Sequence, residues 1–112
     1  MEKNEFEVVI AIVNAGFSQK AMEAARDQGA RGGTIISARG TGTKEMEKKY
    51  GIIITPNKEL LMILVKKEIR DDVLTAIYRS VGMGTDGQGI AFSMPVEDVV
   101  GLKFEAIENE EK

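Results

Sequence analysis

The sequence predicts an α+β protein with the ferredoxin-like order βαββαβ, in which two helices cover one face of a four-stranded antiparallel sheet. Residues 6–38 read as strand, helix, glycine and strand, and residues 59–94 repeat that order. Two such units in succession are typical of the split-βαβ arrangement. The length of 112 residues suits one domain, so we expect a single domain over residues 1–112.

The first half of the chain supplies two strands and a helix. The apolar, β-branched run over 6–13 is too short for a helix and is bounded by polar or glycine residues, so it predicts a strand. Ser18 is the expected N-cap of a helix over 19–28, and Gly29 is its expected C-terminal stop. Residues 34–38 are expected to form the second strand, because β-branched side chains favour an extended backbone.

The second half is interpreted in the same way. The continuous apolar run over 60–65 predicts the third strand. A helix is expected over 70–81, because apolar residues recur there every four positions along one face. Asp71 and Asp72 would suit the positive N-terminal end of this helix, and Gly82 would end it.

The remaining segments connect or end these elements. The charged connection over 42–58, with a short strand over 52–54, resembles either a functional loop or a solvated extension of a hairpin. A tight loop leads to a fourth strand over 90–94, and a short fifth strand is expected over 99–102. Residues from about 104 to 112 form an acidic tail.

The apolar runs over 8–13 and 60–65 create a burial problem. Successive side chains of a strand point to opposite faces, so both faces of the sheet are apolar, whereas two helices cover only one. Each large apolar side chain left in water costs about 1.5–3 kcal/mol. We therefore expect an obligate homo-oligomer, closed by cyclic symmetry.

Composition excludes several functions. The net charge of −3 argues against nucleic acid as a partner. The chain has no cysteine and no histidine, which removes disulfides, the usual zinc ligands and the commonest general base. No nucleophile–base pair is visible, so we do not expect an enzyme. No apolar run approaches the ~20 residues that span a bilayer and the N-terminus does not resemble a signal peptide, so we expect a cytoplasmic protein without direct membrane insertion.

A glycine-rich stretch over 29–42 surrounds the predicted second strand. A strand that leads into Gly40-Thr41-Gly42 can present main-chain N–H groups to an anion. The alternative is that these glycines only form a flexible turn. Gly82-x-Gly84-x-x-Gly87 matches the dinucleotide fingerprint in form, but it follows a helix and precedes a strand, which is the reverse of the order that the fingerprint needs.

Two segments together resemble the PII signal-transduction proteins. Residues 29–34, followed by Gly40-Thr41-Gly42, are similar to the segment before the T-loop of that family, and residues 86–92 are similar to its B-loop and fourth strand. The spacings match over residues 6–102. The resemblance implies a homotrimer with nucleotide in clefts between subunits, and control of a membrane transporter or metabolic enzyme by the T-loop. CutA-type proteins share this architecture, but the glycine pattern favours PII.

The resemblance also assigns candidate site residues by position. The adenine base would lie against Ile12, Thr34 and Leu64. The phosphates of ATP, ADP or AMP, with Mg²⁺ as a companion ion and no tightly bound cofactor, would lie at Gly40, Thr41, Gly42, Thr43, Gly87, Gln88 and Gly89. The partner-binding loop would offer Lys44, Glu47, Lys48 and Tyr50. The residues around this tyrosine do not reproduce the motif of the family's uridylylated tyrosine, so we do not expect its modification.

Some positions depart from the family pattern. Gln88 stands near the position of a B-loop lysine, Thr43 stands where an arginine is expected, and residues 96–101 lack the family's arginines. Losing two or three charge-assisted contacts, at roughly 1.5–3 kcal/mol each, would remove most of an ATP affinity. The alternative function is therefore a PII- or CutA-shaped binding module for another small anion, such as bicarbonate or a carboxylate. The candidate substitute cations are Arg39, Lys44 and Lys103.

Overall fold

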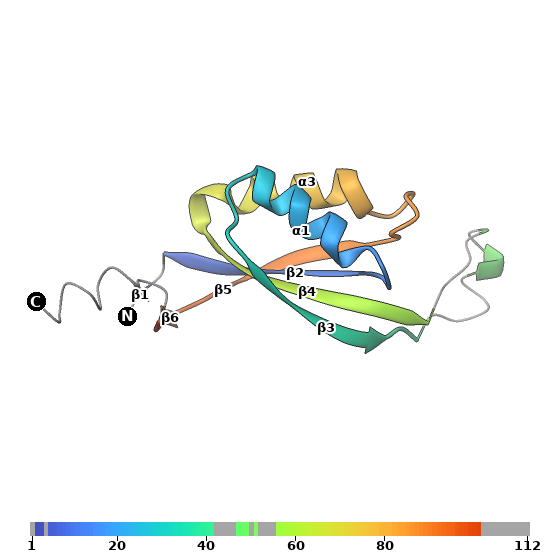
Figure 1. Ribbon diagram of the computed structural model, residues 1–112, viewed down its shortest axis with the longest axis horizontal. Helices are drawn as coiled ribbons and strands as arrows, with labels where there is room; N and C mark the ends of the chain where they lie inside the picture. The colour runs from blue at the N-terminus through green and yellow to red at the C-terminus, as the bar shows by residue number, and fades with distance from the viewer. Residues whose placement is uncertain (1, 4, 42–46, 50, 52–55, 102–112) are drawn as a thin grey trace, which may run out of the picture.

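The computed structural model describes residues 2–3, 5–41, 47–49, 51 and 56–101. Its main sheet has four antiparallel strands in the order β3-β4-β2-β5, and α1 and α3 both lie on one face of it (Figure 1). This arrangement confirms the predicted ferredoxin-like fold. The bounds are β2 (Phe6–Asn14), α1 (Ser18–Asp27), β3 (Gly33–Arg39), β4 (Asn57–Lys66), α3 (Lys67–Val81) and β5 (Ile90–Pro95).

The hydrophobic core lies between the two helices and the sheet. Alternate residues of β2 and β4 point toward the helices, because the side chains of a strand alternate between its faces. The fully buried strand residues are Val9, Ala11, Val13, Leu61 and Ile63. The helices meet them with small and branched side chains, namely Ala21, Ala25, Val73, Ile77 and Val81.

The face of the sheet away from α1 and α3, here called the open face, is apolar and uncovered by any described element. The strand register sets one row across it as Ile36, Leu60, Ile12 and Ile90, and the next row as Thr34, Met62, Ile10 and Phe92. Large side chains in these rows remain exposed, with Met62 at 38% and Phe92 at 41%. The predicted excess of apolar surface is therefore confirmed.

The start of α1 corrects one prediction. Ser18 is not the N-cap, because the helix begins at Ser18 itself and the N-cap position, Phe17, has no side-chain cap. The Ser18 hydroxyl instead donates a hydrogen bond of 2.8 Å to the carboxylate of Glu59 on β4. The helix is therefore capped by a side chain from a distant strand rather than by its own flanking residue.

The end of α1 is as expected within one residue. The helix ends at Asp27, and Gly29 adopts a positive φ of 105°. The Gly29 N–H donates to the Arg26 carbonyl at 2.9 Å, and the Ala30 N–H donates to the Ala25 carbonyl at 3.1 Å. These two bonds form the Schellman pattern that ends many helices, so the predicted role of Gly29 as the stop is confirmed.

Helix α3 begins at Lys67, which is earlier than predicted, and the acidic residue of its first turn is Glu68. The prediction that Asp71 and Asp72 open the helix is therefore wrong. Asp71 accepts a contact of 3.0 Å from the Nε of Arg70 instead. The polar residues at the start of the helix hid its true beginning, because the apolar pattern becomes visible only after the first turn.

Strand β4 begins before the predicted end of the 42–58 connection. Asn57 and Lys58 pair with Arg39 and Ala38 of β3, so they belong to the sheet and only residues before them can form the loop. The predicted short strand over 52–54 lies outside the described residues. The loop between β3 and β4 is hereafter the 40–56 segment.

The chain ends differ partly from expectation. Instead of a strand over 99–102, the structure has β6 (Asp98–Val99), which pairs with β1 (Glu2–Lys3) in a separate two-stranded sheet. The sequence did not predict β1. The acidic tail over 104–112 lies outside the described residues. Among the helices that are described, none has the length and apolar character needed to cross a bilayer.

Candidate functional site

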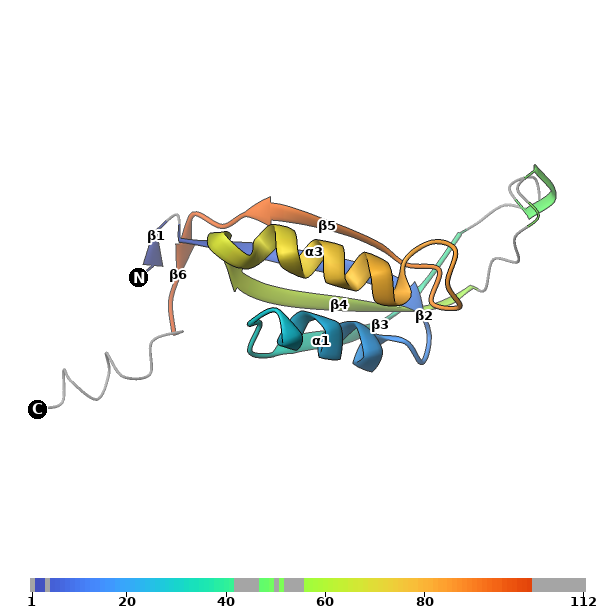
Figure 2. The ribbon, with the colours of Figure 1, turned by 90° about the horizontal axis from the view of Figure 1, so that it is seen from above.

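Three connections meet at one end of the main sheet, at the right of Figures 1 and 2. They are the β2–α1 turn, the α3–β5 loop over 82–89 and the two ends of the 40–56 segment. The Ala15 N–H donates to the Asn57 carbonyl at 3.0 Å, and the Gly40 N–H donates to the Pro56 carbonyl at 2.6 Å. Main-chain hydrogen bonds therefore hold this end, here called the loop end, together.

Asn14, the last residue of β2, joins two of these connections. Its N–H donates to the Gly87 carbonyl at 2.8 Å, and its Nδ2 donates to the Asp86 carbonyl at 2.9 Å. Its Oδ1 accepts a hydrogen bond of 2.6 Å from the Nζ of Lys58 on β4. Asn14 is buried, so water has little access to replace these partners.

The α3–β5 loop is folded closely over Val81. The Gly89 N–H donates to the Val81 carbonyl at 2.7 Å, the Gln88 N–H to the Thr85 carbonyl at 3.0 Å, and the Gly87 N–H to the Thr85 hydroxyl at 3.2 Å. The predicted phosphate donors of this loop are thus already paired within it. The long bond from Gly87 is the weakest of the three, which makes its N–H the donor most readily given to an anion.

The residues predicted to contact adenine all lie on the open face. Ile12 and Leu64 are half-buried and Thr34 is exposed. They occupy three successive rows, because Ile12 pairs with Leu60, Thr34 with Met62, and Leu64 with Val8. Rows on one face are about 6.8 Å apart, so the set, which spans two such spacings, extends over roughly 14 Å. Its role in holding a base stays a prediction.

The other predicted residues are divided between described and undescribed parts of the chain. Gly40 is half-buried and Thr41 is exposed at the end of β3, and Glu47 and Lys48 have helical backbone. The residues outside the described ranges are Gly42, Thr43, Lys44, Tyr50 and Lys103. Arg39 is exposed, and by strand alternation it points to the face opposite Lys58.

Glu59 occupies the N-terminal end of α1 from the other face of β4. One carboxylate oxygen, Oε1, accepts hydrogen bonds from the Gly16 N–H at 2.8 Å, the Ser18 hydroxyl at 2.8 Å and the Ser18 N–H at 3.3 Å. The hydroxyl bond, followed by the Gly16 N–H, lowers the pKa of the Glu59 carboxyl below its ordinary value of 4.5, against a smaller opposing effect of burial. The chain's own carboxylate therefore fills this anion-binding end of a helix.

Replacing Glu59 by glutamine should make stability less dependent on pH. A lowered carboxyl pKa stabilises the fold above the unfolded pKa near 4.5, and this stabilisation is lost as the pH falls through the folded pKa. We expect Glu59→Gln to lose about 1–2 kcal/mol at pH 7, and much less at pH 3. Urea unfolding of the natural chain and of the variant at both pH values measures this difference in the free energy of unfolding. Glu23→Gln, an exposed position on α1, is the control, and an equal difference for Glu59→Gln at both pH values would contradict the prediction.

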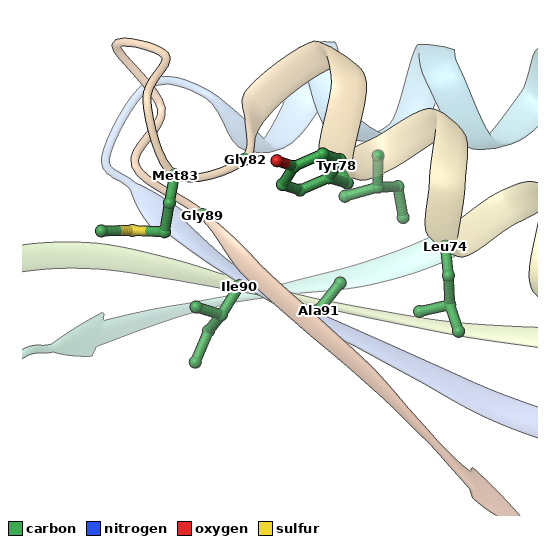
Figure 3. A pocket seen from close by; sticks show the side chains of 8 residues that line it. Leu74, Tyr78, Gly82, Met83, Gly89, Ile90 and Ala91 are labelled. Atoms are coloured by element: carbon green, nitrogen blue, oxygen red, sulfur yellow. The ribbon is translucent and has the colours of Figure 1, made fainter.

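An apolar pocket of about 250 Å³ lies between α3 and the edge strand β5 (Figure 3). Its lining includes Leu74, Tyr78, Met83 and Ile90. No charged side chain lines it. Gly82 and Gly89 also line this pocket, so it borders the α3–β5 loop. It lies at the β5 edge of the sheet, where it includes Ile90, and neither Asn14 nor Lys58 lines it.

Asn14 and Lys58 were not predicted as members of the loop end. The local pattern places Asn14 in a turn and Lys58 at the end of a charged connection. The available signal was their position, since Asn14 directly follows the predicted strand over 6–13 and Lys58 lies two residues before the predicted strand over 60–65. Their pairing spans 44 residues, which no local pattern reveals.

The strand order, the two helices on one face and the loops gathered at one end define a ferredoxin-like protein that presents its loops beside an uncovered apolar sheet. The sequence model of the nitrogen regulatory protein P-II family matches residues 6–106. The chain therefore belongs to the nitrogen regulatory protein P-II family, whose members are regulatory signalling proteins.

Solved structures agree with this assignment. PII of Arabidopsis thaliana, bound to citrate, superposes with a TM-score of 0.67 at 28% identity, over 90% of this chain and 83% of that one. A PII-like signalling protein of Thermus thermophilus gives 0.66 at 20% identity, over 88% and 94%. The GlnK–ATP complex of B. subtilis gives 0.63 at 18% identity, over 86% and 85%. The last two similarities show the fold alone.

Proposed function

We propose that this chain forms a homotrimeric PII regulator that binds an adenine nucleotide in clefts between subunits. The bound nucleotide changes the 40–56 segment, which contacts a membrane transporter or a metabolic enzyme in the cytoplasm, and the protein itself catalyses no reaction. The observation that carries the proposal is the loop end, where a lysine held by a neutral partner and two glycine loops border the open apolar face. Family membership and the ATP complex of GlnK support it.

The open face supports self-association. Ile90, Phe92 and Met94 on β5 are 41–53% exposed, and Ile36 on β3 is 45% exposed. Both edge strands of the sheet thus carry apolar side chains on the same uncovered face. Copies that pack these faces together around an axis would bury this surface and bring the loop end of one subunit beside its neighbour.

Lys58 supplies the positive charge that Gln88 does not. It pairs with Asn14 and Ala38 on the open face, and its side-chain partner within the described residues is the neutral Oδ1 of Asn14. The ion pairs seen over residues 5–41 and 56–101 are those of Arg70, with Glu7 and Asp71. An ammonium forms a stronger hydrogen bond with an anion than with a neutral oxygen. Lys58 is therefore the proposed phosphate ligand.

Calorimetry with ATP, ADP and AMP, each with Mg²⁺, tests the nucleotide proposal. Magnesium would enter with the phosphates, as oxygen ligands suit it. We expect saturable binding of at least one nucleotide, and ATP binding at least roughly tenfold weaker by Lys58→Met, since a charge-assisted contact is worth about 1.5–3 kcal/mol and each 1.4 kcal/mol is about tenfold.

The matched control is Lys66→Met, at the far end of the same strand on the same face. It removes the same charge from the chain without touching the loop end, so its ATP affinity should be unchanged. Absence of saturable binding of all three nucleotides at millimolar concentration would refute the nucleotide proposal. An equal loss in both variants would refute the role of Lys58.

A second candidate function is a binding module for a small carboxylate or bicarbonate. One lysine at the loop end suits a small anion better than a triphosphate, and the Arabidopsis PII structure is a complex with citrate. A thermal-shift series with bicarbonate, citrate and the nucleotides separates the two functions. Stabilisation by the carboxylates that is lost in Lys58→Met, without any stabilisation by nucleotides, would favour this second function.

A further inference from the structure

The side chain of Asn14 contacts both the α3–β5 loop and the start of β4, so it is placed to transmit movement between them. We infer that Asn14 is a positioning residue that couples the α3–β5 loop to the start of β4 through Lys58. This inference deepens the proposed function, because it assigns a route by which an anion at the loop end reaches the 40–56 segment. The part that concerns ligand rests on that function, whereas the coupling itself is a property of the ligand-free protein.

The side chain of Asn14 both donates and accepts a hydrogen bond. Nδ2 donates to the Asp86 carbonyl at 2.9 Å, while Oδ1 accepts from the Lys58 ammonium at 2.6 Å. The two partners fix the amide orientation, because an ammonium only donates and a carbonyl only accepts. An aspartate would keep the acceptor for Lys58 but could not donate to Asp86. Asparagine is therefore matched to a position between these two groups.

The main chain of Asn14 strengthens its hold on the loop. Its N–H donates to the Gly87 carbonyl at 2.8 Å, so consecutive carbonyls, those of Asp86 and Gly87, both accept from this one residue. The residues that follow them carry the N–H groups predicted to meet phosphate. Any displacement of these two peptide groups toward a ligand therefore acts directly on Asn14.

The start of β4 is held to the β2–α1 turn by three consecutive residues. Asn57 accepts from the Ala15 N–H, Lys58 donates to Asn14, and Glu59 accepts from Gly16 and Ser18. Of these three contacts, the one from Lys58 reaches a side chain that also holds the α3–β5 loop, because the other two end within the turn and the start of α1. The side-chain route from the α3–β5 loop to β4 therefore runs through Asn14, beside the main-chain route in which the Gly87 carbonyl accepts from the Asn14 N–H and β2 pairs with β4.

Charge and burial make this contact responsive to an anion. The bond from an ammonium is stronger than one between neutral groups, and Asn14 is only 8% exposed. An anion that draws the Lys58 ammonium away leaves Oδ1 of Asn14 without its partner in a site with little water. The Asn14 amide then shifts, and the Asp86 and Gly87 peptides move with it.

Hydrogen exchange of the ligand-free protein tests the coupling. The readout is the exchange rate of the Gln88 and Gly89 amides in the α3–β5 loop, which Lys58 does not contact. We expect Lys58→Met to raise this rate at least threefold in the natural background and by less than 1.5-fold in an Asn14→Ala background. The matched control background is Asn57→Ala, at an exposed asparagine next to Lys58. In this background, Lys58→Met should still raise the exchange rate at least threefold.

A second variant guards against misfolding of Asn14→Ala. Asn14→Asp keeps the acceptor for Lys58, replaces the donor to Asp86 by an oxygen and adds a negative charge that favours the Lys58 ammonium, so it should abolish the coupling while Lys58 stays paired. A merely structural role of Asn14 would leave the effect of Lys58→Met unchanged in both backgrounds. That result, or the absence of any effect of Lys58→Met on the loop amides, would overturn the inference.

Titration with ATP and Mg²⁺ separates this inference from the proposed function. We expect Asn14→Ala to weaken ATP binding about fivefold in the natural background and less than twofold in the Lys58→Met background, since residues on one path are not additive. If Asn14→Ala weakens ATP binding fivefold in both backgrounds, the inference fails, although the proposal of nucleotide binding is still supported. If the natural protein binds no ATP, the nucleotide proposal fails, and the exchange experiment alone decides the coupling.

Discussion

Phe92→Asp is expected to abolish self-association. Phe92 lies in the middle of β5 on the open face, opposite Ile10, and is 41% exposed in the single chain. Packing of open faces against each other would bury this position, and a buried unpaired carboxylate costs several kcal/mol. We expect the dissociation constant of the assembly to rise roughly a thousandfold or more, which corresponds to about 4 kcal/mol.

Sedimentation at micromolar concentration measures this effect. The natural chain should sediment at three times its mass of 12.2 kDa, and Phe92→Asp at the mass of one chain. Tyr78→Asp is the control. Tyr78 belongs to α3, on the helix side of the sheet, and is 64% exposed. A folded single chain for the natural protein, or a trimer of unchanged stability for Phe92→Asp, would refute the proposed use of the open face.

Gly89→Ala should cause a large loss of stability at the loop end. A Cβ at Gly89 would lie 2.6 Å from the Val81 carbonyl oxygen and 2.8 Å from Cγ1 of Val13. Neither neighbour can yield easily, since the first is backbone at the end of α3 and the second is a fully buried core side chain. Overpacking of this kind typically costs about 1–3 kcal/mol, and we expect the upper part of that range.

Chemical denaturation of Gly89→Ala and Gly32→Ala tests this prediction. Gly32 has open space around an added Cβ and no positive φ, so alanine there should change the free energy of unfolding by less than about 0.5 kcal/mol. In the natural chain, the Gly89 N–H donates to the Val81 carbonyl at 2.7 Å. The amide at position 89 of the variant should lose its protection from hydrogen exchange. Equal stability of the two variants would show that the loop relaxes around the added methyl group.

The fold could be predicted because its signals are local. Apolar runs indicate the strands β2 and β4, and Gly29 indicates the end of α1, since a left-handed residue after a helix is encoded by one position. The uncovered face followed from the alternation of side chains in apolar strands. These features depend on short stretches of sequence and on the geometry of one element.

The start of α1 could not be predicted in the same way. Its N-terminal N–H groups bind the carboxylate of Glu59, which is 41 residues from Ser18. A serine beside the first helical turn is typical of an N-cap, and nothing nearby indicates that its hydroxyl serves as a donor to another strand. Such a contact becomes visible only once the register of β4 against β2 is known.

The candidate site could be predicted only in outline for the same reason. The glycine loops carry a recognisable pattern, which indicates that they are neighbours at one end of the sheet. Asn14 contacts Asp86 across 72 residues and Lys58 across 44, and its importance arises from the meeting of three elements. The sequence offers Arg39 as a substitute cation, yet strand alternation turns that side chain to the opposite face.

The adjacent charges Lys58 and Glu59 point to opposite faces of β4, one to the open face beside Asn14 and the other to the end of α1. Sliding β4 by one position would exchange these faces, which would aim a carboxylate at Oδ1 of Asn14 and an ammonium at the helix N-terminus. Both electrostatic contacts would change from attraction to repulsion. Insertions and deletions in the β3–β4 connection of homologous chains should therefore fall between Gly40 and Pro56, so that evolution can change the length of this segment without altering the frame of β4.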